Sequence, residues 1–155
     1  MASFIQYYYG ARIIQEDNEM AVIDELIKEE NGALSFGNFE LTTKTKLDGF
    51  DFQGDKYKIK TFNEITKLER NGSFVYESVP GTVVHDFKTN DNSVEFKVEG
   101  VEDSQITLEL EAGQEYVIVI DGNSTGSVKT NLGGKLNLSV ELNPGQISEI
   151  KVEKL

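Results

Sequence analysis

His85 is the single histidine of the chain, so a reaction that needs an imidazole as general base would depend on it. The adjacent Asp86 is poorly placed to orient the ring, because neighbouring residues of a strand point to opposite faces. No Gly-x-Ser-x-Gly sequence offers a serine nucleophile. We therefore interpret His85 as a histidine on the surface of a strand and predict no catalytic residues.

The sequence also predicts no metal ion and no cofactor. Zinc sites rely on cysteine or on several histidines, and the chain has no cysteine. Residues 121–126 match the first positions of an EF-hand calcium loop, but Leu132 stands where that loop requires a bidentate glutamate. Because the flanking residues have strand patterns, we interpret this segment as a hairpin turn. The 27 acidic residues provide many carboxylate pairs of the kind that hydrolyse glycosidic bonds, and the sequence singles out none.

Three consecutive tyrosines, Tyr7, Tyr8 and Tyr9, form the most distinctive cluster of side chains suited to a binding surface. In a strand, Tyr7 and Tyr9 would share one face, where their rings could stack on a sugar or enter a protein interface. Ordinary packing near the edge of a sheet is the alternative explanation. Tyr7 and Tyr9 are therefore the candidate ligand-binding residues.

The composition limits the partners. A net charge of −12 provides no basic surface for nucleic acid or anionic membranes, and acidic residues dilute the densest lysine cluster, Lys56, Lys58 and Lys60. The first residues contain no basic stretch followed by an apolar one, so no signal peptide is predicted. No segment approaches the roughly 18 apolar residues of a membrane-spanning helix. A cytoplasmic location follows as the expectation.

The elements that must position these residues are mostly strands. Alternating or apolar runs with the pattern of strands occupy residues 36–41, 43–47, 57–61, 74–79, 82–87, 94–99, 106–111, 136–142 and 150–152. Residues 116–120 are apolar throughout, which predicts a central strand covered on both faces. Turns are predicted at Asp48-Gly49, Gly54-Asp55, Asp121-Gly122 and Gly133-Gly134.

Residues 17–32 are ambiguous. Asp17 or Asn18 can cap a helix, and Asn31-Gly32 can end it. Residues 20–24 have the pattern of a strand equally well. The segment therefore forms either one short helix or a strand.

The two prolines, Pro80 and Pro144, are each followed by glycine, a pair that suits a type II turn. Similar segments precede the two pairs: residues 54–57, which end in Tyr57, and residues 113–116, which end in Tyr116. This similarity indicates an internal repeat that begins at these segments. We therefore predict an all-β, mostly antiparallel fold of two small sandwich-like modules, residues 1–90 and 91–155, with at most one short N-terminal helix.

Two resemblances bear on function. Residues 116–122, followed by Gly126, Thr130-Asn131 and residues 133–140, resemble the C-terminal accessory β-sandwiches of bacterial polysaccharide-degrading enzymes. Residues 35–41 and 76–82 resemble small Firmicutes proteins, some of which carry the label endosialidase. No catalytic residue transfers from this label, because sialidases use three arginines and the chain has only Arg12 and Arg70.

We expect a non-enzymatic structural or interaction module, because the sequence assembles no catalytic set. A carbohydrate-binding module or an endosialidase-like protein that acts on glycans is the alternative. The expected partners are another protein, a second copy of the chain, or a glycan.

Overall fold

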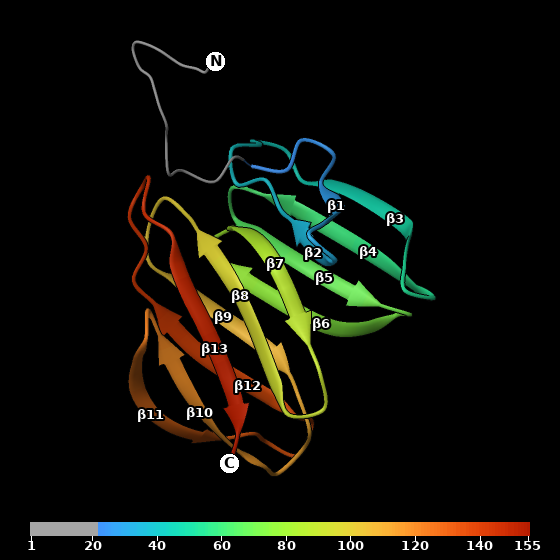
Figure 1. Cartoon of the computed structure of the whole chain (residues 1–155). Coiled ribbons are helices and arrows are strands. Elements are labelled where there is room, and N and C mark those ends of the chain that lie inside the picture. The colour runs from blue at the N-terminus through green and yellow to red at the C-terminus, as the bar shows by residue number, and fades with distance from the viewer. Residues whose placement is uncertain (1–21) are drawn as a thin grey trace.

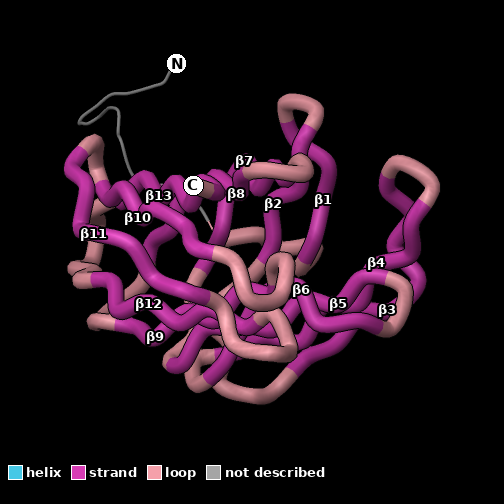
Figure 2. Tube along the Cα trace, turned by 90° about the horizontal axis from the view of Figure 1, so that it is seen from below, coloured by secondary structure: helices cyan, strands magenta, loops and turns pink. Residues whose placement is uncertain are grey.

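The computed structural model describes residues 22–155, which form two antiparallel sheets packed as a sandwich and contain no helix (Figure 1). In spatial order, the seven-stranded sheet consists of β1 (Ile27–Glu30), β2 (Ala33–Phe36), β7 (Val83–Thr89), β8 (Ser93–Glu99), β13 (Ser148–Lys154), β10 (Glu115–Ile120) and β11 (Asn123–Lys129). The six-stranded sheet consists of β12 (Lys135–Val140), β9 (Ser104–Glu109), β6 (Ser73–Val79), β5 (Ile65–Arg70), β4 (Asp55–Phe62) and β3 (Thr45–Phe52). Figure 2 shows the two layers. The predicted all-β, antiparallel class is confirmed.

The core lies between the sheets and is built from the apolar residues of the alternating strands. At its centre, the buried rings of Phe36, Tyr76, Phe87 and Phe96 contact one another, with ring centroids 5.3 to 6.2 Å apart. Most of these pairs meet edge to face, the arrangement that ring quadrupoles favour. Tyr76 comes from the six-stranded sheet and the phenylalanines from the other, so the cluster joins the two layers.

Several hairpins turn at a pair ending in glycine, with positive φ at both residues as in a type I′ turn. The pairs are Asn31-Gly32, Gln53-Gly54, Asn71-Gly72 and Asp121-Gly122. The turn predicted at Asp121-Gly122 is confirmed. Asn31-Gly32 ends no helix but joins β1 to β2. The described residues 22–26 form neither the helix nor the strand expected at 20–24, and the strand of this segment begins at Ile27. The rest of that segment lies outside the described residues.

Two predicted elements in the first half are wrong. The strand predicted at residues 36–41 ends at Phe36, because Gly37 has a φ of 103° and approaches the backbone oxygen of Thr82. The turn predicted at Asp48-Gly49 lies within β3, where the pairing with β4 shifts register. Glycine suits both a bulge and a turn, so the sequence does not separate them.

Only one Pro-Gly pair forms the predicted type II turn. Gly145 has a φ of 80°, and Gln146 N donates to Asn143 O over 3.0 Å, as that turn requires. The Val79-Pro80 bond is cis, and Gly81 has no positive φ. Glycine is required at 81 for a different reason: a Cβ there would lie 2.1 Å from Phe62 O. Both pairs follow a strand of the six-stranded sheet and precede one of the seven-stranded sheet.

Strand β10 lies between β13 and β11, as expected for a strand away from the edge. Tyr116 and Ile118 are buried, whereas Val117 and Val119 are only half-buried. The prediction that both faces are covered is therefore wrong for one face.

Strands from both halves of the chain contribute to both sheets. β6 pairs with β9 and β7 pairs with β8, so each sheet contains a pairing that crosses residue 90. β4 and β10, the strands at which the proposed repeat begins, lie in different sheets. The division into two modules, residues 1–90 and 91–155, stays a prediction.

Candidate ligand-binding cleft

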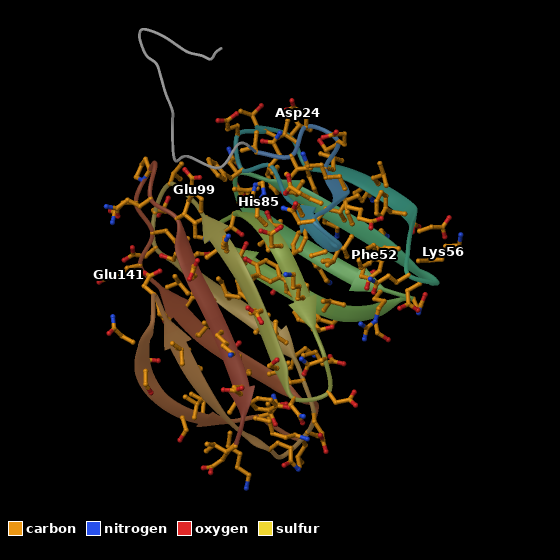
Figure 3. All side chains as sticks on the ribbon, viewed as in Figure 1. Asp24, Phe52, Lys56, His85, Glu99 and Glu141 are labelled. Carbon is orange, nitrogen blue, oxygen red and sulfur yellow. The ribbon has the colours of Figure 1, made fainter. Side chains whose placement is uncertain are left out.

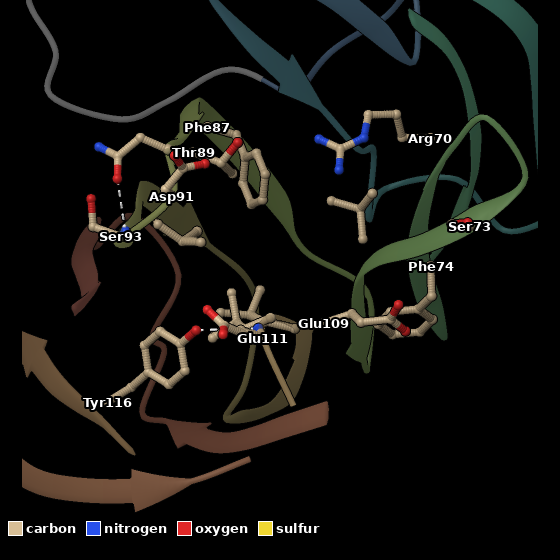
Figure 4. Close-up of a pocket in the computed structure, with 15 residues that line it drawn as sticks. Arg70, Ser73, Phe74, Phe87, Thr89, Asp91, Ser93, Glu109, Glu111 and Tyr116 are labelled. Carbon is tan, nitrogen blue, oxygen red and sulfur yellow. Dashed lines mark hydrogen bonds between the residues drawn. The ribbon is translucent and has the colours of Figure 1, made fainter. Parts of the chain in front are cut away.

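A cleft opens between the sheets at the end of the sandwich where β5 turns into β6 and β7 turns into β8 (Figure 4). It consists of two adjoining cavities of about 420 and 390 Å³, which we call the end cleft. Each volume is typical of a site for a small ligand. Both cavities are lined by Arg70, Val75, Phe87, Thr89, Asn90 and Ser93.

Aromatic side chains form much of the apolar lining. Phe87 and Tyr116 are buried and belong to the core, so their positions are fixed by packing. Phe74 lines the larger cavity and Phe52 the smaller one. Both of these rings are half-buried, which leaves part of each ring accessible to a ligand.

Backbone and side-chain hydrogen bonds shape the loop between β7 and β8 that borders the cleft. Asn90 Oδ1 accepts hydrogen bonds from the backbone N–H groups of Asn92, over 2.8 Å, and Ser93, over 2.9 Å. Asn90 N in turn donates to Ser93 O over 3.0 Å. These bonds hold Thr89, Asn90 and Asp91 against the cleft as preformed polar groups.

Arg70 ends β5 and lies where the two cavities meet. Its guanidinium is drawn at the mouth of the cleft in Figure 4. Among the described residues, no carboxylate forms an ion pair with Arg70, although the chain carries 27 acidic residues. A guanidinium offers five N–H donors in a fixed plane, so Arg70 is available to a ligand.

Two acidic side chains at the rim are held by lysines. Lys135 Nζ lies 3.1 Å from Glu109 Oε1, and Lys154 forms an ion pair with Glu111. The hydrogen bond to Glu111 raises the pKa of Lys154. The backbone N–H of Glu111 also donates to the hydroxyl of Tyr116 over 3.2 Å (Figure 4). These contacts fix the rim of the larger cavity.

His85 lies on β7 among side chains of neighbouring strands (Figure 3). It is 9% exposed, so the interpretation of a surface histidine is wrong. Its Nδ1 lies 2.8 Å from Glu30 Oε1, and Ser35 Oγ donates to the same oxygen over 2.7 Å. The bond from Ser35, together with His85, lowers the pKa of Glu30 despite the opposing effect of burial.

This cluster has a serine, a histidine and a carboxylate, but not in the order of a nucleophilic triad. In that triad the histidine stands between the serine and the acid. Here Glu30 stands between Ser35 and His85. Asp86 is turned away by a local bulge, with a φ of 56°, and its N–H donates to Ser35 Oγ over 3.2 Å. The arrangement stabilises the junction of β1, β2 and β7.

The other predicted site residues have clear positions or lie outside the structure. Tyr7 and Tyr9 fall outside the described residues, so their binding role stays a prediction. Asp121 forms the hairpin turn between β10 and β11, and its Oδ1 accepts a hydrogen bond from Glu149 N over 2.8 Å. Across residues 22–155, no three His, Asp or Glu side chains gather as a metal site.

The sequence analysis did not find the end cleft. Its lining comes from nine strands, β2 to β10, and from the loops between them, so residues far apart in the sequence line one cleft. No local motif marks Arg70. The Asn71-Gly72 turn that follows it is of the same kind as other hairpin turns of the chain. The only signal in the sequence is that arginine is rare, since the chain has two arginines and 27 acidic residues. This rarity could have marked Arg70 for attention.

Comparison of the chain with family models, with curated proteins and with solved structures found no match. The resemblances given above therefore stay predictions. Within the described part of the chain, no helix is long and apolar enough to cross a membrane.

Proposed function

We propose that the protein is a non-enzymatic binding module that holds a carbohydrate in the end cleft. The observation that carries the proposal is the position of Arg70, a guanidinium with no ion-pair partner among the described residues, at the junction of two cavities. A sugar presents hydroxyl groups around its ring and apolar C–H groups on its faces. The end cleft offers a complement to both.

Polar and aromatic groups line the end cleft together with Arg70. Thr89, Asn90 and Ser93 line both cavities and supply hydroxyl and amide groups for hydrogen bonds. Phe52 and Phe74 supply partly accessible rings for stacking. The lining of the end cleft is more polar than apolar, which suits a ligand rich in hydroxyl groups.

Two of the five acidic side chains that line the end cleft are held by lysines, which supports binding more than hydrolysis. Glu109 and Glu111 are engaged by Lys135 and Lys154 at the rim. Away from the end cleft, Ser35 donates its hydrogen bond to Glu30, not to His85. We therefore assign the end cleft a binding role.

The proposal predicts that Arg70→Gln weakens binding of an oligosaccharide selected on a glycan array. The expected loss is about tenfold or more, because a hydrogen bond to a charged group contributes about 1.5–3 kcal/mol. Nuclear magnetic resonance titration of the labelled protein measures the affinity and locates the ligand from shifts at Asn90 and Ser93.

The matched control is Lys129→Gln, which removes one positive charge from the exposed strand β11. It should bind as the wild type does. The proposal fails if no oligosaccharide on the array shifts the cleft residues, or if Arg70→Gln and the wild type bind with the same affinity.

A further inference from the structure

One straight row of polar residues crosses all the strands of the six-stranded sheet on its outer face. Each residue stands directly opposite the next in the strand pairing. From β3 to β12 the row consists of Lys46, Lys60, Lys67, Glu77, Thr107 and Asn137. With strands about 4.8 Å apart, the row is roughly 24 Å long. We call it the polar row.

The first half of the polar row places like charges opposite each other. Lys60 stands between Lys46 on one side and Lys67 on the other. Lysines directly opposite on neighbouring strands repel one another and destabilise a sheet. Partial burial, followed by the positive charges of Lys44, Lys67, Lys46 and Lys58, lowers the pKa of Lys60.

Few carboxylates neutralise these lysines. Lys67 Nζ lies 3.6 Å from Glu69 Oε2. Among the described residues, no carboxylate forms an ion pair with Lys44, Lys46, Lys58 or Lys60. Lys67 also stands opposite Glu77 and Lys58 opposite Glu69, so the unneutralised positive charge is concentrated at Lys44, Lys46 and Lys60. In a chain of net charge −12, this local positive charge favours contact with an anion.

After Glu77, which stands opposite Lys67, the polar row ends in two uncharged residues that can bind hydroxyl groups, Thr107 and Asn137. Thr107 Oγ1 donates to Asn137 Oδ1 over 2.7 Å. Beside them, Gln105 Nε2 donates to Ser139 Oγ on the same two strands. Amides and hydroxyls keep further donor and acceptor capacity after one such bond.

We propose that the outer face of the six-stranded sheet binds an acidic polysaccharide that lies along the polar row. Carboxylate or sulfate groups of the chain contact Lys46, Lys60 and Lys67, and its hydroxyls contact Thr107 and Asn137. The lysine half spans roughly 10 Å across three strands. This is a short footprint for duplex DNA, whose binding needs many phosphate contacts. An acidic peptide would use the lysines but leave Thr107 and Asn137 without a ligand group.

Lys67 lies near the end cleft, since its Nζ is 5.8 Å from the ring centroid of Phe74, but the inference does not rest on the function proposed for that cleft. The test measures binding of wild-type protein to heparin-derived and polygalacturonate oligosaccharides by isothermal titration calorimetry. We expect binding that weakens as salt rises, because counterions compete for the lysines. The triple variant Lys46→Gln/Lys60→Gln/Lys67→Gln should lose this binding.

The matched control is Lys97→Gln/Lys129→Gln/Lys151→Gln, which makes the same change in net charge on the other sheet. It should keep the wild-type affinity, as should Arg70→Gln, whose defect is confined to the end cleft. Circular dichroism checks that each variant folds. The double variant Thr107→Ala/Asn137→Ala, which keeps all the lysines, should also bind the acidic oligosaccharides more weakly than the wild type does.

Three results would overturn the inference. The first is that the wild-type protein binds neither acidic oligosaccharide. The second is that the two triple variants bind with the same affinity. The third is that polyglutamate or duplex DNA binds as tightly as the glycans. The last result would replace the glycan with another polyanion as the partner of this face.

Discussion

Glu30 makes the stability of the fold depend on pH. Its carboxylate is held by Ser35 and lies beside His85, and its pKa is below the ordinary value. A carboxyl whose pKa is lower in the folded protein stabilises the fold above its ordinary pKa. That contribution is lost as the pH falls through the folded pKa. We therefore expect stability to decline toward acidic pH as Glu30 binds a proton.

The variant Ser35→Ala tests this contact. At pH 7 it should lower the free energy of unfolding by about 1–3 kcal/mol, because it removes a bond to a charged carboxylate. The loss should be smaller near pH 3, because protonation of Glu30 weakens this contact progressively as the pH falls. Part of the loss should persist, since Ser35 Oγ also accepts a bond from Asp86 N. Urea unfolding at both pH values measures the difference.

Ser127→Ala is the control, because Ser127 is an exposed hydroxyl on the outer strand β11. It should leave the free energy of unfolding almost unchanged at both pH values. A loss for Ser35→Ala that is equal at pH 7 and pH 3 would contradict a role for the Glu30 charge.

In the six-stranded sheet, repulsion between the lysines of the polar row destabilises the pairing of β3, β4 and β5. Lys60→Gln removes the central charge of three. It should raise the free energy of unfolding at low salt by about 0.2–1 kcal/mol, the usual size of a cross-strand pair. Since salt screens exposed charges, the gain should shrink at high salt.

Lys129→Gln is the comparison for this prediction, because Lys129 stands opposite Glu115 on β10. Removal of a lysine from an attractive pair should give no gain in stability. Thermal unfolding at two salt concentrations compares the variants. A lower melting temperature for Lys60→Gln than for the wild type would show that the row is not repulsive.

The sequence predicts the alternation of these strands but not their register. Residues 57–61 alternate as predicted, and β4 has its lysines on the outer face. Which residue stands opposite Lys60 depends on the bulge in β3 and on the length of each hairpin loop. The densest lysine cluster along the chain, Lys56 to Lys60, is therefore not the densest cluster in space. The end cleft escaped prediction for a similar reason, since distant strands line it.

Across the whole molecule, the two sheets join the halves of the chain. Phe87 from the first half and Phe96 from the second contact each other in the core, with ring centroids 5.5 Å apart. β6 and β7 find partners in β9 and β8, beyond residue 90. Period-two patterns predicted the class of this fold, but they do not state which strands are neighbours.

We therefore expect that neither residues 1–90 nor residues 91–155 fold when expressed alone. Each fragment would expose part of the shared core and two unpaired strand edges, one in each sheet. Circular dichroism and a cooperative unfolding transition test each fragment. The full chain is the control. A cooperative transition in either fragment would instead support two independent modules.

The place of β13 has a consequence for synthesis of the protein. β13 follows every other strand in the sequence, yet it lies between β8 and β10 in the seven-stranded sheet. Until the ribosome has added it, β10 and β11 have no bond to the rest of that layer. Between the synthesis of β10 and that of β13, the nascent chain thus carries two incomplete edges, and β13 closes both at once.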